Sequence, residues 1–236
     1  LLAAGYPRIF QICRCFRKGE RGHRHLPEFT LLEWYRVASD YHGLMDECQA
    51  LVGYVSRALE RAPRLEYQGS VVDLSPPWER MTVAEAFARF AGVAPDQALA
   101  DDRFDEIMGV AIEPRLGRRR PVFLCDYPVN CGALARPKPE NPALVERFEL
   151  YIAGVEICNG YSELTDVDEQ RRRFGIERGH RIKAGKPATP MPERFLQALA
   201  SMPAAAGNAL GLDRLVMLFA GSDRIDDVSA FTPEEL

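Results

Sequence analysis

A basic turn and the strand that follows it carry side chains that could bind a phosphate and an amine. The stretch FRKGERGHRHLPEFTLLEWYR spans residues 16–36, and its first half is crowded with arginines and histidines. Arg17 and His25 stand at the two ends of this turn, where they could receive a phosphate, since arginine gives forked hydrogen bonds. Side chains two residues apart on a strand face the same way, so Glu33 and Tyr35 could together receive an ammonium group. A hairpin whose charges simply face water would account for the same residues.

A second stretch, VERFELYIAGVEICNGYSEL, carries acids that could hold a metal ion. Glu149 and Glu156 flank a tight Ala153-Gly154 turn, which can bring them onto facing strands as a pair of carboxylates. Such hard oxygen ligands suit a Mg²⁺ ion that also touches a polyphosphate. Surface acids on a hairpin are the alternative. However, Glu156, Asn159 and Glu163 stand among apolar residues, where unpaired carboxylates are costly, and this setting favours a functional site.

A third stretch, GNALGLDRL at residues 207–215, could approach a nucleotide. Its small residues would let the backbone come close to a ligand. Arg214, expected at the start of the following helix, could stack its planar guanidinium on a purine. An ordinary turn from a strand into a helix explains this pattern nearly as well.

The elements that position these residues are predicted from the spacing of apolar side chains. Alternation over residues 8–37 predicts a long antiparallel hairpin around the basic turn. Helical spacing predicts a helix over residues 43–62. Thr82 and Glu85 form a capping box for a second helix, which Gly92 is expected to end.

The second half of the chain is predicted to alternate between strands and helices. Residues 93–120 are weakly patterned, with one short helix near 104–111 and the arginine cluster RLGRRRP. Such a cluster is usually a solvated turn, and binding of a partner is the alternative. The other expected elements are a strand at 120–128, two strands within 145–164, a mobile loop at 178–192, a helix at 192–201 and a strand–helix unit at 207–221. Antiparallel strands mixed with scattered helices, without repeats or a separating linker, predict an α+β fold.

The composition is that of an ordinary globular protein, with 236 residues and a net charge of −4. This charge gives no general signal for nucleic-acid binding, which would need a local basic patch. The six cysteines contain no CxxC pair and are interpreted as reduced core thiols of a cytosolic protein. Cys13 and Cys15 share one strand face, but two ligands do not make a zinc site. No apolar run approaches the roughly 18 residues of a membrane span, and no signal peptide is visible.

The three stretches, taken in order, resemble the catalytic core of the class II aminoacyl-tRNA synthetases. CFRKGERGHRHLPEFTLLEWYR is similar to motif 2 of the lysyl enzymes, and ERFELYIAGVEICNGYSELTD to their amino-acid- and metal-binding segment. GNALGLDRL is similar to motif 3. The resemblance covers nearly the whole chain. It implies a class II catalytic domain over residues 1–236, with an antiparallel β-sheet flanked by helices and no anticodon-binding domain.

The resemblance also implies where such an enzyme would place its substrates. Arg17 would hold the α-phosphate of ATP and act with Glu156 in catalysis, and Glu149 and Glu156 would bind Mg²⁺. His25 would lie near the outer phosphates. Phe29 and Arg214 would sandwich the adenine. The full implied ATP site is Arg17, Gly19, Glu20, His25, Leu26, Phe29, Glu156, Ile157, Gly211 and Arg214. The implied amino-acid pocket is Glu33, Tyr35, Asn159, Glu163 and Ala209, with Glu163 nearest the distal ammonium of a lysine-like substrate.

Several departures from the lysyl-tRNA synthetase pattern refine these expectations. Gly19 stands where motif 2 usually has a glutamate, and the acid follows as Glu20, so the adenine contact is shifted or made by the backbone. Ala209 replaces a glycine, and residues 93–120 form a shorter insertion than in the synthetases. These features are similar to the truncated paralogues of lysyl-tRNA synthetase that attach β-lysine to a lysine of elongation factor P.

That similarity implies a cytoplasmic, AMP-forming ligase that uses ATP and Mg²⁺ to activate (R)-β-lysine as an adenylate. The acceptor would be elongation factor P and not tRNA. A homodimer is implied as well, although motif 1, normally the dimer interface, would precede Leu1 in an N-terminal part that we expect to be missing. Two alternatives stay open: a lysyl-tRNA synthetase fragment, and a catalytically silent paralogue that binds an amino acid or tRNA. The chain retains the residues that would bind phosphate and metal. This argues against a catalytically silent paralogue, because a protein that only binds an amino acid or tRNA has no need of them.

Overall fold

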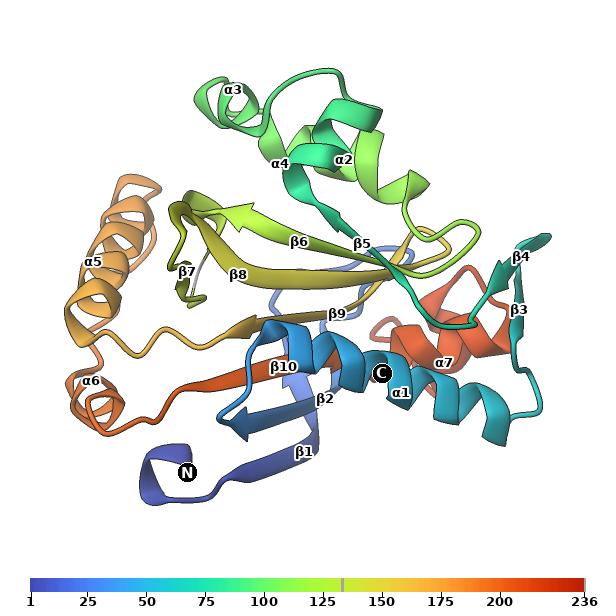
Figure 1. Cartoon of the computed structure of the whole chain (residues 1–236), viewed down its shortest axis with the longest axis horizontal. Helices are drawn as coiled ribbons and strands as arrows, with labels where there is room; N and C mark the ends of the chain where they lie inside the picture. The colour runs from blue at the N-terminus through green and yellow to red at the C-terminus, as the bar shows by residue number, and fades with distance from the viewer. Residues whose placement is uncertain (133, 236) are drawn as a thin grey trace.

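The chain is built around one large β-sheet, seen in Figure 1, a computed structural model that describes residues 1–132 and 134–235. The strand order in this sheet is β1-β2-β10-β9-β8-β6-β5, and β7 pairs with β8. Neighbouring strands are antiparallel, except that β5 and β6 are parallel. A separate hairpin is formed by β3 and β4. The strands are β1 Arg8–Phe16, β2 Glu28–Val37, β3 Arg64–Tyr67, β4 Ser70–Asp73, β5 Glu79–Thr82, β6 Val122–Pro128, β7 Pro137–Lys138, β8 Asn141–Ile152, β9 Val155–Ser162 and β10 Ala205–Gly211.

The helices lie around this sheet, as Figure 1 shows, so the expected α+β class with an antiparallel sheet is confirmed. They are α1 Tyr41–Ala58, α2 Val83–Phe90, α3 Pro95–Ala100, α4 Phe104–Ile107, α5 Val167–Lys183, α6 Glu193–Leu199 and α7 Leu212–Ala220. One-turn 3₁₀ segments and a π-helical turn at Met108–Ile112 complete the elements. Among the described residues, none of the helices is both long and apolar enough to cross a membrane.

The sheet has one face packed against α1 and α7 and a second face that carries the site described below. Successive residues of a strand point to opposite faces, and β2 shows this clearly. Leu32 and Trp34 pack against the core that contains the buried residues of α1 and α7. Phe29 and Leu31 instead line a cavity. A second core of α2, α3 and α4 side chains forms against β6 and β8 around the fully buried Phe87.

Both hairpins that position the expected site are confirmed. β1 and β2 pair from Arg8↔Arg36 to Phe16↔Glu28, so the basic turn joins two strands as predicted. β8 and β9 are joined by Ala153 and Gly154, whose φ angles of 55° and 76° are those of a type I′ turn. A capping box at Thr82 and Glu85 begins α2, as its sequence predicts. Gly221, with φ 76°, ends α7.

Several expected elements have different bounds in the structure. The helix expected over 43–62 is α1, which begins earlier because Asp40 caps it by accepting a hydrogen bond from the Gly43 amide, and which ends at Ala58. Within 93–120 the chain forms α3 as well as α4, and a π-helical turn continues α4. The short strands β3, β4, β5 and β7 were not predicted, because segments of two to four residues carry too little alternation.

The loop expected over 178–192 is partly wrong, because α5 continues to Lys183. This helix has no apolar stripe that periodicity could detect. It is stabilised by the Asp166 cap, which accepts hydrogen bonds from two backbone amides, and by ion pairs from Glu169 to Arg172 and Arg173. A polar helix supported by its own side-chain pairs is not visible to a hydrophobic pattern.

Candidate active site

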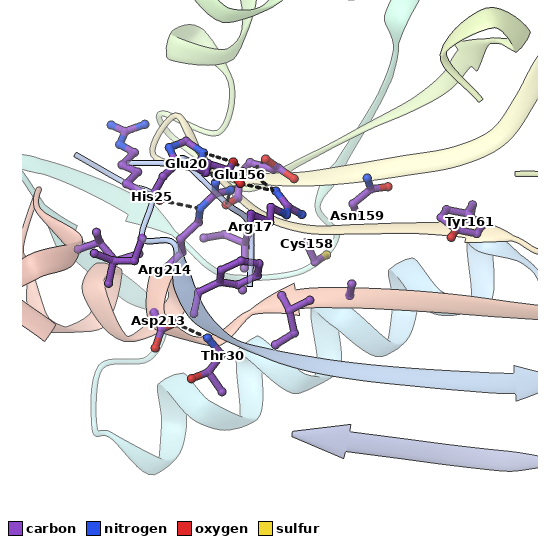
Figure 2. A pocket seen from close by; sticks show the side chains of 18 residues that line it. Arg17, Glu20, His25, Thr30, Glu156, Cys158, Asn159, Tyr161, Asp213 and Arg214 are labelled. Atoms are coloured by element: carbon purple, nitrogen blue, oxygen red, sulfur yellow. Dashed lines mark hydrogen bonds and ion pairs between the residues drawn. The ribbon is translucent and has the colours of Figure 1, made fainter. Parts of the chain in front are cut away.

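A cavity of about 220 Å³ brings together the three stretches that the sequence singled out. It is bordered by the basic turn, β2, β9, β10 and the first turn of α7 (Figure 2). The predicted ATP-site residues that line it are Arg17, Glu20, His25, Leu26, Phe29, Glu156, Ile157, Gly211 and Arg214. Two predicted substrate residues, Asn159 and Ala209, line it too. One cavity therefore contains a cluster of side chains suited to bind phosphate, next to part of the expected amino-acid pocket.

Arg214 connects all three stretches through its guanidinium. Its Nη1 donates to the Glu156 carboxylate at 2.9 Å and to the Glu156 carbonyl at 3.0 Å, while its Nε donates to the Arg24 carbonyl at 3.2 Å. Its Nη2 lies 2.7 Å from His25 Nε2 (Figure 2). Burial and the nearby Arg214 charge lower the pKa of His25, so the neutral ring can accept this hydrogen bond. A rigid guanidinium plane is thus held at the cavity wall.

The basic turn places its displaced acid inside the cavity. Gly19 has φ 78°, a left-handed conformation that favours glycine. Glu20 then lies beside Arg17, with 3.3 Å between Nη1 and Oε1, and 3.7 Å from His25 Nε2. The Arg17 guanidinium lies 5.1 Å from the centroid of the Phe29 ring. Gly19 itself, predicted as part of the ATP site, is not among the cavity residues, whereas Glu20 lines the cavity.

The two expected metal-binding acids lie on neighbouring strands, with a bulge between Leu150 and Tyr151. The register partner of Glu149 is Asn159, while Glu156 pairs with Tyr151. Burial, and then the charge of Glu149, raise the pKa of Glu156, which means that the two carboxylates are close enough to repel each other.

Glu149 is buried and already bound by three donors. The hydroxyls of Tyr127 and Tyr151 each donate to its Oε2 at 2.7 Å, and Arg147 Nη2 donates to its Oε1 at 2.6 Å. Glu113, which sequence reasoning missed, has its pKa raised by burial and by both Glu149 and Glu156. Repelling carboxylates of this kind fit a hard cation such as Mg²⁺, whose remaining ligands are usually water and phosphate oxygens. The donor set therefore suits the metal that the sequence predicted.

The amine end of the expected pocket lies in a second cavity of about 320 Å³. Tyr35 and Glu163 line this cavity, and Tyr161 borders both cavities. Glu163 Oε1 is buried and has no hydrogen-bond partner among the described residues. Burial raises the pKa of Glu163 to about 8. A buried carboxylate oxygen without a partner among the described residues indicates a place for a cationic group.

Gly207 allows this arrangement and was missed by sequence reasoning. A Cβ atom at Gly207 would lie 2.5 Å from Glu163 Oε1 and 2.5 Å from the Tyr35 ring, so only glycine lets both side chains close over β10. Glu33 lines neither cavity in the structure. It lies on β2 opposite Ala209 of β10, and its Oε2 accepts a hydrogen bond from Gln11 at 2.7 Å.

Other cavity residues also carried no recognisable signal. Asp213, in the first turn of α7, accepts a hydrogen bond from the Thr30 amide at 2.6 Å and so ties α7 to β2 (Figure 2). The remaining ones are Arg24, Leu31, Cys158, Tyr161 and Ile225. The only signal that could have found them is their position beside the motifs, since most are common apolar or structural residues.

Comparison with known proteins identifies the family. The family model for class II tRNA synthetases (D, K and N) matches residues 1–235. The elongation factor P--(R)-beta-lysine ligase of Vibrio atlanticus is 39% identical over 238 residues, which covers 98% of this chain and 73% of that protein. The ligase of the same name from Vibrio cholerae is 40% identical with the same coverage.

A relative with a different name covers a smaller share of its own length. The lysine--tRNA ligase of Moorella thermoacetica is 39% identical over 251 residues, covering 98% of this chain and 51% of that protein. The chain belongs to the class II tRNA synthetase family of the D, K and N type.

Proposed function

We propose that this chain activates (R)-β-lysine with ATP as an aminoacyl-adenylate and transfers the acyl group to a lysine side chain of elongation factor P. The observation that carries the proposal is the buried Oε1 of Glu163, which has no hydrogen-bond partner among the described residues. Glu163 and Tyr35 line one cavity, and Tyr161 connects it to the cavity that Arg17 and Arg214 line. The distal ammonium of a substrate would neutralise the Glu163 carboxylate, while the carboxylate of the same substrate would reach the proposed ATP site. The names of two relatives at about 40% identity support this choice of substrate and acceptor.

In the first step the substrate carboxylate attacks the α-phosphorus of ATP and pyrophosphate leaves. Arg17, at the mouth of the turn, would stabilise the charge that develops on the α-phosphate. The adenine would lie between Phe29 and Arg214, whose guanidinium is already held in one plane by Glu156 and the Arg24 carbonyl. When bound at Glu149 and Glu156, Mg²⁺ would neutralise phosphate charge. No covalent enzyme nucleophile is needed, so catalysis rests on positioning and electrostatics.

In the second step an amine of the acceptor attacks the acyl carbon, an amide bond forms and AMP leaves. ATP–pyrophosphate exchange, measured with α-lysine and each β-lysine isomer, tests the first step. Transfer of the acyl group to elongation factor P or to lysine tRNA tests the second. Transfer to tRNA alone would favour the lysyl-tRNA synthetase alternative. Absence of any exchange would favour an amino-acid-binding paralogue.

Substrate binding is expected to weaken as the pH falls below about 8, because burial raises the pKa of Glu163 to about 8. The ammonium of the substrate needs the carboxylate, so at lower pH each ligand that binds must first displace a proton from Glu163. Linkage then predicts that the apparent dissociation constant rises about tenfold per pH unit below this pKa and levels off just above it. Calorimetric titration at several pH values measures both the constant and the released proton.

The matched control for this pH dependence is an analogue of the substrate that lacks the distal amine. Its binding should be weaker and should show no such slope, because Glu163 can stay protonated. Glu163→Gln should remove the slope for the amine-bearing substrate. A wild-type constant that does not change between pH 8 and pH 6 would overturn the role of Glu163.

Basic side chains near the end of α5 are expected to steer the protein acceptor. Arg171, Arg172 and Arg173 are held by Glu193 and Glu169, whereas Arg178, Lys183 and Lys186 are exposed. Reversing these last three charges should slow modification of the acceptor by about tenfold at low salt without changing pyrophosphate exchange, since such charges act mainly on association rate.

Charge reversal of Arg57, Arg61 and Arg64, which are also exposed but lie near the end of α1, is the control. It should leave both steps unchanged. Equal effects of the two triple variants on modification, or a loss of exchange in the α5 variant, would contradict a specific docking role for α5.

A further inference from the structure

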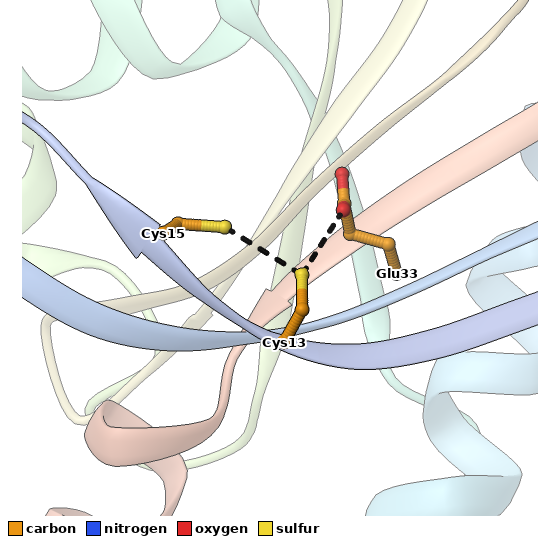
Figure 3. A group of neighbouring side chains, drawn as sticks. All are labelled: Cys13, Cys15 and Glu33. Atoms are coloured by element: carbon orange, nitrogen blue, oxygen red, sulfur yellow. Dashed lines mark hydrogen bonds between the residues drawn. The ribbon is translucent and has the colours of Figure 1, made fainter.

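Two thiols and a carboxylate meet on the open face of the sheet, outside both cavities (Figure 3). Cys13 and Cys15 point to the same face of β1, and Glu33 reaches them from β2. The two sulfur atoms are 3.8 Å apart, and Cys13 Sγ lies 4.0 Å from Glu33 Oε2. Their ligand atoms all lie within 4.8 Å of one another, and all three residues are partly buried.

The spacing of the two sulfur atoms matches what a shared cation would require. In tetrahedral coordination, two sulfurs at about 2.3 Å from Zn²⁺ are separated by about 3.8 Å. The observed separation of the two Sγ atoms is 3.8 Å. A carboxylate oxygen in the same sphere would need to move only slightly closer to Cys13 than its 4.0 Å. All three residues keep some exposure, so water can supply the fourth ligand.

We propose that Cys13, Cys15 and Glu33 form a binding site for a thiophilic divalent cation such as Zn²⁺. Binding releases the two thiol protons to solvent. The two thiolates and the carboxylate then carry more negative charge than the divalent cation carries positive charge. The third ligand comes from the neighbouring strand, through the Gln11↔Glu33 register. This cross-strand carboxylate turns a pair of cysteines into a three-ligand site.

The site has a consequence for catalysis, and this step rests on the proposed function. Glu33 lies opposite Ala209 and belongs to the amino-acid pocket that the resemblance implies, although it lines neither cavity while it accepts the Gln11 hydrogen bond. A cation that holds Glu33 toward β1 would keep it from turning toward the substrate. Metal and amino acid should therefore compete, and a thiophilic cation should inhibit adenylate formation reversibly.

Cobalt titration of the whole, chelator-treated chain tests the site without ATP or amino acid, so the result is independent of the proposed function. Co²⁺ should bind one per chain with a thiolate-to-cobalt charge-transfer absorption, and Zn²⁺ should displace it. Cys13→Ser, Cys15→Ser and Glu33→Gln should each weaken binding by at least about 10- to 100-fold, the cost of removing a side chain that merely supports a metal ligand. Cys131→Ser, which changes another partly exposed thiol, is the control and should bind as the wild type does. No thiolate absorption, or equal losses in the Cys131 variant, would overturn the proposal.

Alkylation of the wild-type protein gives a second measurement, which does not depend on whether a variant folds. Saturating Zn²⁺ should protect Cys13 and Cys15 from iodoacetamide and leave Cys131 reactive, as peptide mass spectrometry would show. Unchanged labelling of Cys13 and Cys15 would contradict the site. A disulfide between the two thiols in place of protection by metal would contradict it as well. Titration of Co²⁺ with β-lysine present then tests the competition: unchanged cobalt affinity would overturn the shared use of Glu33, while the metal site itself would stand on the earlier results.

Discussion

Replacing Glu156 with glutamine is expected to lower the rate of adenylate formation by at least about 100- to 1,000-fold. This is the loss seen in other enzymes when one group that stabilises transition-state charge is removed. Glu156 is placed to serve two partners. Its Oε2 accepts a hydrogen bond from Arg214 at 2.9 Å, and burial, followed by the charge of Glu149, raises its pKa. A glutamine oxygen can still accept the Arg214 hydrogen bond, so the cavity wall should keep its shape. What is lost is the negative charge that would bind Mg²⁺.

Pyrophosphate exchange at saturating ATP measures this loss, and circular dichroism checks the fold. Glu149→Gln should also lower exchange strongly, because its amide group would have to face the Tyr127, Tyr151 or Arg147 donors that now bind a carboxylate. Glu193→Gln removes an exposed carboxylate that pairs with Arg171 and should leave exchange unchanged. Near-normal pyrophosphate exchange in the Glu156→Gln protein would contradict the assignment of a metal site to Glu149 and Glu156.

The parts of the site that could be predicted are those in which neighbouring residues decide the geometry. A type I′ turn at Ala153-Gly154 follows from local backbone preference, and it puts Glu149 and Glu156 on adjacent strands. Alternation along β2 likewise puts Glu33 and Tyr35 on one face. Even here the bulge after Leu150 was not visible, so the direct register partner of Glu149 turned out to be Asn159.

The parts that could not be predicted depend on which strands become neighbours. Cys13 and Cys15 share a face by alternation, but the third ligand, Glu33, comes from pairing across the hairpin. Gly207 looks like any small residue until β10 is placed between β2 and β9, where its missing Cβ admits Glu163 and Tyr35. Periodicity reports on one segment at a time and holds no information about such register.

Ala209 is expected to help select β-lysine over α-lysine, and the sheet register gives the reason. The two substrates share a long chain and a distal ammonium, so Glu163 cannot tell them apart. They differ in whether the second amine is one or two carbons from the carboxylate. Ala209 lies on β10 between Glu33 of β2 and Asn159 of β9, and it lines the cavity. Its methyl group is therefore part of the wall beside which we expect that second amine to bind.

Ala209→Gly should then raise the use of α-lysine relative to β-lysine by about 10- to 200-fold, the range that one methyl group supplies in a pocket. We expect a methyl in place of a hydrogen to obstruct the position of an α-amine and to leave the position of a β-amine free. The measurement is the ratio of kcat/KM for the two substrates in pyrophosphate exchange, wild type against variant. Gly211→Ala, which adds a methyl where the cavity meets Arg214, is the control: a Cβ there meets nothing closer than 3.6 Å, so it should not change the ratio. An unchanged ratio in Ala209→Gly would remove Ala209 as the selector and, with it, the strongest residue-level reason to prefer β-lysine over α-lysine as the substrate.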